Sequence, residues 1–181
     1  MTINHDVDVS KAREKYKVLY EYFKLQFEDA KGQYFKLEDK SSKYLTFLNI
    51  FIPLYIFGFT FVLSKIPEIN QLLLLSLSLS IICSFLCFCS SWSFIFRSLK
   101  MMTIPKMPAD REVVEFFHTH ENLESIYCFQ VNLYREGILL YNDVNDNKIR
   151  LINIAYKEIA FGSWSFMLSI CLLLAINWIY L

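Results

Sequence analysis

The residues best suited to chemistry form one short cluster, His118-Thr119-His120-Glu121. Imidazole and carboxylate groups are common zinc ligands, so the cluster raises the question of a metal site. Side chains two positions apart diverge on a helix, and His118 and His120 could share a metal only in an extended loop. No second set of ligands is evident in the sequence. We therefore interpret the cluster as the solvent-exposed end of a helix.

Five cysteines are the other candidates for metal or redox chemistry. Cys83, Cys87, Cys89 and Cys171 lie in apolar stretches, whereas Cys128 lies in a polar one. Their spacing fits neither a C-x-x-C pair nor a zinc pattern. We expect neither a disulfide nor a metal site.

Sequence motifs of the common enzyme classes are also missing. The sequence contains no P-loop, no dinucleotide-binding glycine pattern, no G-x-S-x-G and no H-E-x-x-H. The formal net charge of zero argues against a strongly basic nucleic-acid surface. We expect no enzymatic activity, no catalytic residue, no cofactor and no dominant direct contact with nucleic acid.

Three apolar runs, at residues 44–64, 72–96 and 159–181, contain no Asp, Glu, Lys, Arg or His. Each is long enough to cross a hydrocarbon core of roughly 30 Å as a helix. We therefore predict an all-α integral membrane protein with three transmembrane helices. The remaining segments are an amphipathic arm at 1–43, a short outer loop at 65–71 and a helical segment at 97–158.

The distribution of basic residues predicts the orientation. Nine Lys and Arg residues precede the first run and eight lie between the second and third, whereas the hairpin at 65–71 carries only Lys65. Basic loops remain in the cytoplasm. This places the amino terminus and residues 97–158 in the cytoplasm of a multi-pass inner (plasma) membrane protein whose carboxyl terminus lies on the outer side.

Apolar residues recur every three or four positions from Ser10 to Lys43, which predicts a helix with Ser10 as its N-cap. A helix capped by Asp110 and ending near His118 should follow a break at Pro105 and Pro108. From Leu123 onward a second long helical pattern appears. Polar residues at 142–147 interrupt it, and they predict either a local turn or a polar site in one continuous helix that enters the third run.

The second run carries small residues at spacings of three and four, which place them on one helical face. These residues are Ser76, Ser80, Cys83, Ser84, Cys87 and Ser91. Small residues let helices approach closely in a membrane. The face is either a packing surface within one chain or the lining of a pore between copies. The runs contain no carboxylate, histidine or basic residue, which argues against conventional transport.

The polar helices are rich in aromatic residues and are expected to pack on each other, on other copies or on another protein. The residues that we assign to partner docking are Tyr16, Tyr20, Phe23, Phe27, Tyr134 and Tyr141. The expected partners are membrane lipid, further copies of the chain and a cytoplasmic protein or ribonucleoprotein.

The layout resembles a known family. A helical arm, the step Asp39-Lys40-Ser41-Ser42 before the first run, a short outer hairpin and an Asn- and Lys-containing helix at 145–157 are similar to the small membrane effectors of bacterial anti-phage operons. That group includes the transmembrane effectors of retrons and of cyclic-nucleotide-signalling defence systems.

The resemblance implies a toxin that a cytoplasmic sensor holds inactive until infection, when oligomerisation or release damages the inner membrane and halts the cell. Because the chain shows no nucleotide-binding motif, a retron reverse transcriptase with its RNA–DNA hybrid is favoured over a second messenger as the controlling element. The alternative is a harmless membrane-anchored scaffold or accessory subunit that tethers a soluble complex. A channel or transporter subunit is a third possibility.

Overall fold

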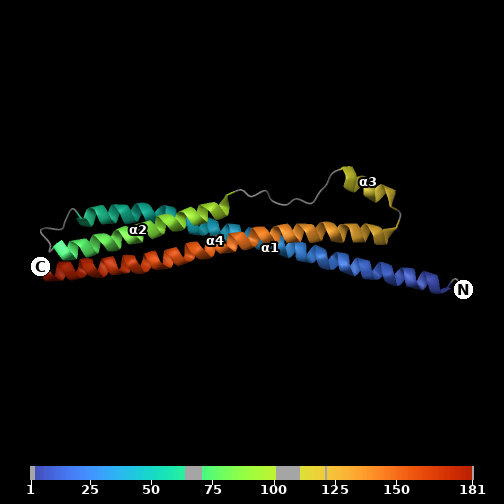
Figure 1. The fold of residues 1–181 in the computed structure, drawn as a ribbon, viewed down its shortest axis with the longest axis horizontal. Helices are drawn as coiled ribbons and strands as arrows, with labels where there is room; N and C mark the ends of the chain where they lie inside the picture. Colours follow the sequence, from blue (N-terminus) through green and yellow to red (C-terminus); the bar gives the residue numbers. More distant parts are fainter. Residues whose placement is uncertain (1–2, 64–70, 101–110, 121, 181) are drawn as a thin grey trace. The chain divides into compact units, whose positions relative to one another are not determined.

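The computed structural model describes residues 3–63, 71–100, 111–120 and 122–180. Within these ranges it contains no strand and four helices, as the all-α prediction requires (Figure 1). The helices are α1 (Ile3–Leu63), α2 (Gln71–Leu99), α3 (Arg111–Thr119) and α4 (Leu123–Tyr180). The Pro105 and Pro108 break, the Asp110 cap and the outer loop other than Gln71 lie outside the described residues.

Three of the four helices, α1, α2 and α4, are long and apolar enough to cross a membrane. The helix α1 begins at Ile3, so the predicted N-cap at Ser10 is wrong. No Pro or Gly lies between these positions to keep the helix from starting earlier. The end of α3 at Thr119 agrees with the helix end expected at the histidine cluster.

The helix α4 passes through residues 142–147 without interruption. The continuous-helix prediction is therefore confirmed, and the turn does not form. Packing explains the result, because Asn145 is buried and its Nδ2 donates to the carbonyl oxygen of Ala30 at 3.0 Å. A polar side chain with an acceptor on a facing helix does not need to end its own helix.

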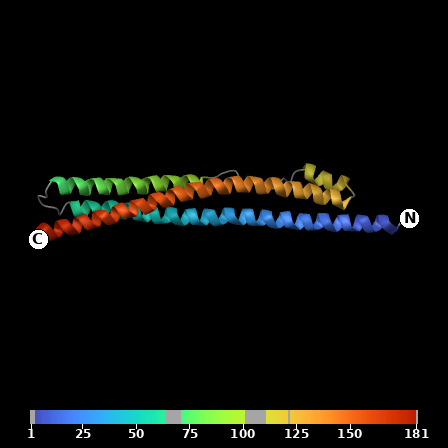
Figure 2. The same ribbon diagram turned by 60° about the horizontal axis from the view of Figure 1, so that its bottom comes forward.

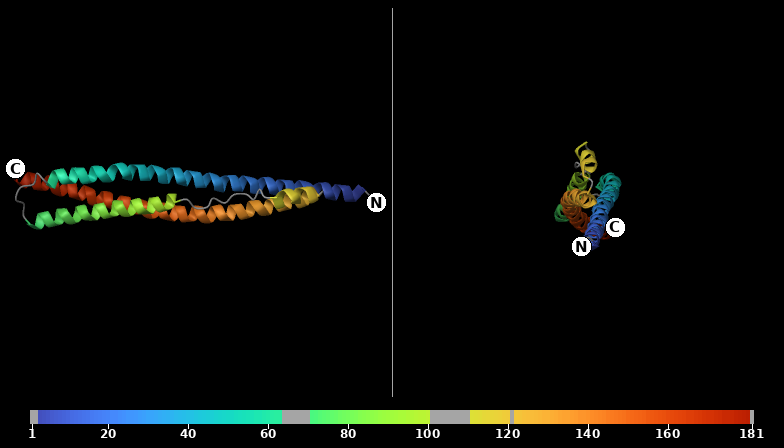
Figure 3. Two further views of the ribbon diagram at one scale, coloured as in Figure 1. Left: turned by 90° about the horizontal axis from the view of Figure 1, so that it is seen from above. Right: turned by 90° about the vertical axis from the view of Figure 1, so that its right-hand side faces the viewer.

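The chain forms two compact units, which we describe separately. Unit 1 contains Met1–Leu37 and Met101–Asp146, and unit 2 contains Glu38–Lys100 and Asn147–Leu181. In unit 1 the amino-terminal part of α4 lies along α1, and α3 packs on α4 (Figure 2). In unit 2 the helix α2 lies along the carboxyl-terminal part of α4 (Figure 3).

Residues that pack between the helices recur every seven positions. In α1 the series is Tyr20, Phe27 and Tyr34 in unit 1, followed by Ser41, Leu48 and Tyr55 in unit 2. In α4 it is Tyr134 and Tyr141 in unit 1, followed by Lys148, Ala155, Gly162, Ser169 and Ile176 in unit 2. In α2 it is Leu77, Ser84, Ser91 and Ser98. A repeat of seven is typical of helices that pack as a left-handed coiled bundle.

The unit boundaries do not coincide with the ends of the apolar runs. Unit 2 extends beyond the predicted transmembrane ranges because small side chains continue its helix packing there. Ser98 Oγ donates to Ser41 Oγ at 2.9 Å, and both residues are buried outside the apolar runs. Ala155, also outside a run, is fully buried.

Candidate functional site

The most developed polar arrangement in unit 2 is a ladder of serine hydroxyls between α2 and α4. Ser80 Oγ donates to the Ser165 carbonyl oxygen at 2.9 Å, and Ser165 Oγ donates to the Ser80 carbonyl oxygen at 2.8 Å. The Ser80 and Ser169 hydroxyls lie 2.9 Å apart. Each helix therefore supplies both a donor and an acceptor to its neighbour.

The ladder continues toward the end of unit 2 that carries the basic residues Lys43 and Arg97. Ser84 Oγ donates to the Gly162 carbonyl oxygen at 2.9 Å, and Ser91 Oγ donates to the Ala155 carbonyl oxygen at 3.0 Å. Such bonds require close backbones, and Gly162 permits the approach. A Cβ at Gly162 would lie 3.1 Å from Cys87 Cβ and 3.3 Å from a ring carbon of Phe88.

The structure divides the six residues of the predicted small-residue face into two groups. Ser80, Ser84 and Ser91 are buried and bond α4 within the same chain. Ser76 is exposed, and its hydroxyl donates to the Leu73 carbonyl oxygen of its own helix at 2.9 Å. Cys83 and Cys87 are half-buried and carry free thiols.

The surface of unit 2 differs from that of a water-soluble protein. Its interior combines apolar clusters around Leu48, Phe88 and Leu77 with Ser41 and five further buried serines of α2 and α4, whereas its surface exposes large apolar side chains. Leu75 is 70 % exposed, Phe57 is 73 % exposed and Trp178 is 88 % exposed. In a water-soluble protein, exposed apolar patches rarely exceed a few hundred Å².

Unit 1 packs by contacts between aromatic rings. The Tyr20 and Tyr134 ring centroids lie 5.7 Å apart, and the Phe27 ring lies 5.4 Å from Tyr134 and 5.5 Å from Tyr141. Gly137 leaves the space that the Phe27 ring occupies, since a Cβ there would lie 2.7 Å from Phe27 Cε2. The Phe27 ring therefore requires a glycine at position 137.

These contacts occupy four of the six residues that we assigned to partner docking. Tyr20, Phe27, Tyr134 and Tyr141 touch one another, and Tyr141 is only 2 % exposed. A partner could reach Tyr141 only if α1 and α4 separated. Burial raises the pKa of Tyr141, and burial together with the hydrogen bond to Tyr20 raises the pKa of Tyr134 to about 12.

The other two docking candidates, Tyr16 and Phe23, are half-buried. Tyr16 borders an open cavity of about 430 Å³ that Phe116, Cys128 and Phe129 also line. The sequence pattern did not single out a second apolar row on the outside of α1, formed by Val18, Tyr22 and Leu25, which are all more than half exposed. Their spacing of four and three residues was the signal that places them on one face.

A charged pair in unit 2 was also missed. Lys148 is buried, and its Nζ lies 3.7 Å from Glu38 Oε1. Burial lowers the pKa of Lys148, and the nearby Glu38 carboxylate opposes that change. The lysine occupies a seven-residue repeat position, so its spacing from Tyr141 and Ala155 could have indicated its burial.

Two members of the histidine cluster, His118 and His120, lie among the described residues. The His120 ring stacks on Phe116 with centroids 4.0 Å apart, and His118 is exposed. Glu121 lies outside the described residues. Among residues 3–63, 71–100, 111–120 and 122–180, no three His, Cys, Asp or Glu side chains are placed to hold a metal ion.

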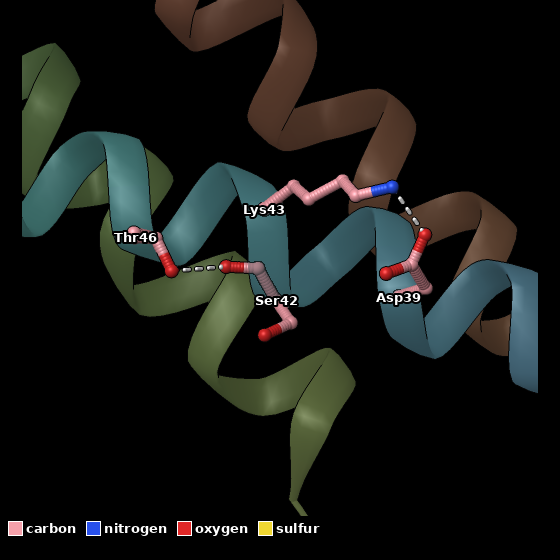
Figure 4. Close-up of polar contacts among 4 residues, drawn as sticks. All are labelled: Asp39, Ser42, Lys43 and Thr46. Carbon is pink, nitrogen blue, oxygen red and sulfur yellow. Dashed lines mark hydrogen bonds and ion pairs between the residues drawn. The ribbon is translucent and has the colours of Figure 1, made fainter.

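The step Asp39-Lys40-Ser41-Ser42 lies on α1 at the basic end of unit 2. Lys43 Nζ pairs with Asp39 Oδ2 at 2.6 Å, and Thr46 Oγ1 donates to the Ser42 carbonyl oxygen at 2.9 Å (Figure 4). Both contacts are exposed and join residues of one helix, so each contributes little to stability. Ser41, by contrast, is buried against Ser98.

Comparison of the chain with protein-family models, with curated proteins and with solved structures finds no match.

Proposed function

We propose that the chain is an integral protein of the bacterial inner membrane, with residues 44–64, 72–96 and 159–181 as its spans. The observation that carries this proposal is the apolar surface of unit 2. Lipid supplies no hydrophobic driving force between helices, so close packing, small residues and hydrogen bonds between helices hold such a unit together. The basic residues that flank the spans support a cytoplasmic unit 1 and an outer carboxyl terminus.

Within that membrane we propose that the chain acts as the toxic effector of an anti-phage abortive-infection system. The resemblance of its layout to such effectors supports this function. Such a protein acts by changing its assembly in the bilayer. A cytoplasmic ribonucleoprotein that contains a reverse transcriptase is the favoured controlling partner.

In this proposal the serine ladder stabilises the inactive state. Ser80, Ser84 and Ser91 use their hydroxyls within one chain, so they are not available to a second copy. Activation would require α2 and α4 to separate, which would expose carbonyl oxygens and hydroxyls to lipid. Unpaired polar groups in lipid favour association with another copy.

Expression of the chain alone in a bacterial host tests the proposal. An effector freed from its partner should stop growth and collapse the membrane potential, which a voltage-sensitive dye reports. Ser80→Leu and Ser84→Leu should change this toxicity at equal membrane abundance. Ser76→Leu is the matched control, because Ser76 is exposed and bonds only its own helix.

The second candidate function is a harmless anchor that tethers a soluble complex. The closed ladder favours it, because unit 2 satisfies its own polar groups as a stable anchor would. Unimpaired growth and membrane potential at high membrane abundance would select the anchor over the effector. Recovery of the chain in the soluble fraction after a carbonate wash would contradict both functions.

A further inference from the structure

One polar side chain lies on the outside of α1 within the first apolar run. Asn49 is exposed, and large apolar side chains such as Ile50 and Phe57 are exposed near it. It lies five residues after the start of the run at residue 44, which is about 7.5 Å along the helix axis. In the proposed membrane location, a polar group at that depth is costly unless it is hydrogen-bonded.

The Asn49 side chain retains a donor after its bond within the chain. Trp92 Nε1 donates to Asn49 Oδ1 at 2.7 Å, which fixes the orientation of the amide. An amide NH₂ group carries two N–H donors. The side chain therefore offers a donor from the exposed side of α1.

The backbone carbonyl of Asn49 lacks its usual helical donor. A carbonyl in an α-helix accepts from the N–H four residues later, and here that residue is Pro53, which has no N–H. Asn49 and Pro53 are both exposed. One residue thus presents both a donor, its NH₂ group, and an acceptor, its carbonyl oxygen.

A second copy of the chain supplies both missing partners. Acyl chains neither donate nor accept hydrogen bonds, and the ester oxygens of a lipid only accept them. Two copies inserted in the same direction are related by a two-fold axis along the membrane normal, which places Asn49 of both at one depth. The NH₂ group of each copy can then donate to the Asn49 carbonyl of the other.

The surface of α1 around Asn49 permits this approach. Exposed residues at spacings of four and three form one face, and none of them is aromatic. They are Ser42, Thr46, Asn49, Pro53, Ile56 and Thr60. The Thr46 and Thr60 hydroxyls donate to carbonyl oxygens of their own helix, so they need no partner in the second copy. This spacing is typical of helices that pack side by side at a small angle.

We propose that this face of α1, with Asn49 at its centre, binds the same face of a second copy. The inference rests on the proposed membrane location of unit 2, and it names the surface by which copies associate. The contact does not require α2 and α4 to separate. It therefore applies to an inactive effector and to an anchor alike.

Energy transfer between copies tests the proposal. The full chain, carrying a donor or an acceptor fluorophore at its amino terminus, is reconstituted in vesicles of phosphatidylethanolamine and phosphatidylglycerol. Dilution with lipid at a fixed ratio of the two labels gives the dissociation constant of the pair. We expect transfer that falls on dilution as a monomer–dimer equilibrium requires.

Two substitutions remove the two halves of the contact. Asn49→Leu removes the donor and should raise the dissociation constant about five- to tenfold, as expected for the loss of two bonds between helices in a membrane. Pro53→Ala supplies the missing N–H to the Asn49 carbonyl within α1, so it should also weaken the pair although alanine favours the helix. Ser163→Leu is the matched control, because Ser163 is exposed and its hydroxyl donates to the Ile159 carbonyl oxygen of its own helix.

Lack of transfer at every dilution, from chains that stay in the vesicles, would overturn the contact while leaving the membrane location intact. Chains that a carbonate wash removes from the vesicles would overturn both. Association that survives Asn49→Leu, or that Ser163→Leu weakens equally, would refute this surface. Association that Asn49→Leu weakens and Pro53→Ala leaves unchanged would contradict the assigned acceptor.

Discussion

The two units differ in the polar contacts between their helices and in their surfaces, although both bury aromatic rings. Unit 1 joins α1 and α4 through large aromatic rings such as Phe27 and Tyr141, and its surface mixes charged residues with exposed apolar ones. Unit 2 buries apolar side chains such as Phe88 and Leu77, but it also joins α2 to α4 through serine hydroxyls and Gly162, and large apolar side chains are exposed on its surface. The same helices, α1 and α4, take part in both arrangements.

On the proposed location of unit 2 in lipid, the surrounding solvent explains the difference. Water favours the burial of apolar surface by about 25 cal/mol for each Å² removed from it. Lipid supplies no such hydrophobic term, so close contact and hydrogen bonds between helices become more important. The seven-residue repeat is common to both units, so the helix geometry stays the same while the polar contacts change.

The largest expected effect tests the close contact in unit 2. Gly162→Leu should lower the free energy of unfolding by about 3 kcal/mol, because its side chain would meet Cys87 and Phe88 and push α4 from α2. Thermal unfolding in detergent, followed by circular dichroism, measures the change. Gly58→Leu is the control, since a Cβ at Gly58 meets nothing within 4 Å. Equal losses for the two variants would show that the contact is not tight.

Alkaline pH should change the stability of the two units in opposite directions. Above pH 10 the unfolded tyrosines ionise, whereas burial keeps the pKa of Tyr134 at about 12. Unfolding then releases a proton, and unit 1 should lose about 2 kcal/mol of stability by pH 12. Absorbance at 295 nm follows the ionisation. Tyr134→Phe should remove the latest component of that titration.

Proton linkage at Lys148 should raise the stability of unit 2 with increasing pH, in a window below pH 10.5. Burial lowers the pKa of Lys148 below 10.5, so the unfolded chain binds more protons between the lowered pKa and 10.5. The Lys148 contribution to stability should therefore rise as pH increases through that window. All tryptophans of the described residues, Trp92, Trp164 and Trp178, belong to unit 2, and their fluorescence can report its unfolding. Lys148→Met should abolish the rise, and persistence of the rise would assign it to another group.

A smaller effect tests the aromatic packing of unit 1. Gly137→Ala places a methyl group 2.7 Å from Phe27 Cε2, which must move away from Tyr134 and Tyr141. We expect a loss of about 1 kcal/mol in the free energy of unfolding, measured by urea titration. Gly32→Ala should instead stabilise by about 0.5–1 kcal/mol, since nothing lies within 4 Å and alanine favours helix. Stabilisation by both substitutions would refute the contact.

The smallest effect isolates one hydroxyl of the ladder. Ser84→Ala removes the bond to the Gly162 carbonyl oxygen and should lower the free energy of unfolding by about 0.6 kcal/mol. Ser78→Ala should change it by less, because the Ser78 hydroxyl bonds Leu74 of its own helix. Indistinguishable unfolding curves would assign the cohesion of unit 2 to close contact alone.

The sequence was sufficient for the helical fold and for the three helices that can cross a membrane. Apolar runs and helical periodicity are local properties of the chain, so they can be read without knowledge of what each helix touches. The serine face of α2 was visible for the same reason. The helix that packs on this face could not be predicted, because the sequence of one helix does not reveal whether its neighbour is α4 or a helix of another copy.

Only the tertiary structure decided which side chains the helices share. Packing fills the space at Gly137 with the Phe27 ring, turns Asn145 from a helix breaker into a donor to Ala30, and buries Lys148. These outcomes depend on how α1 and α4 are aligned, because that alignment brings together residues more than a hundred positions apart in the sequence. The physical reason is that a side chain's hydrogen-bond partners and its access to solvent belong to the assembled interface, whereas helix formation and hydropathy belong to the chain itself.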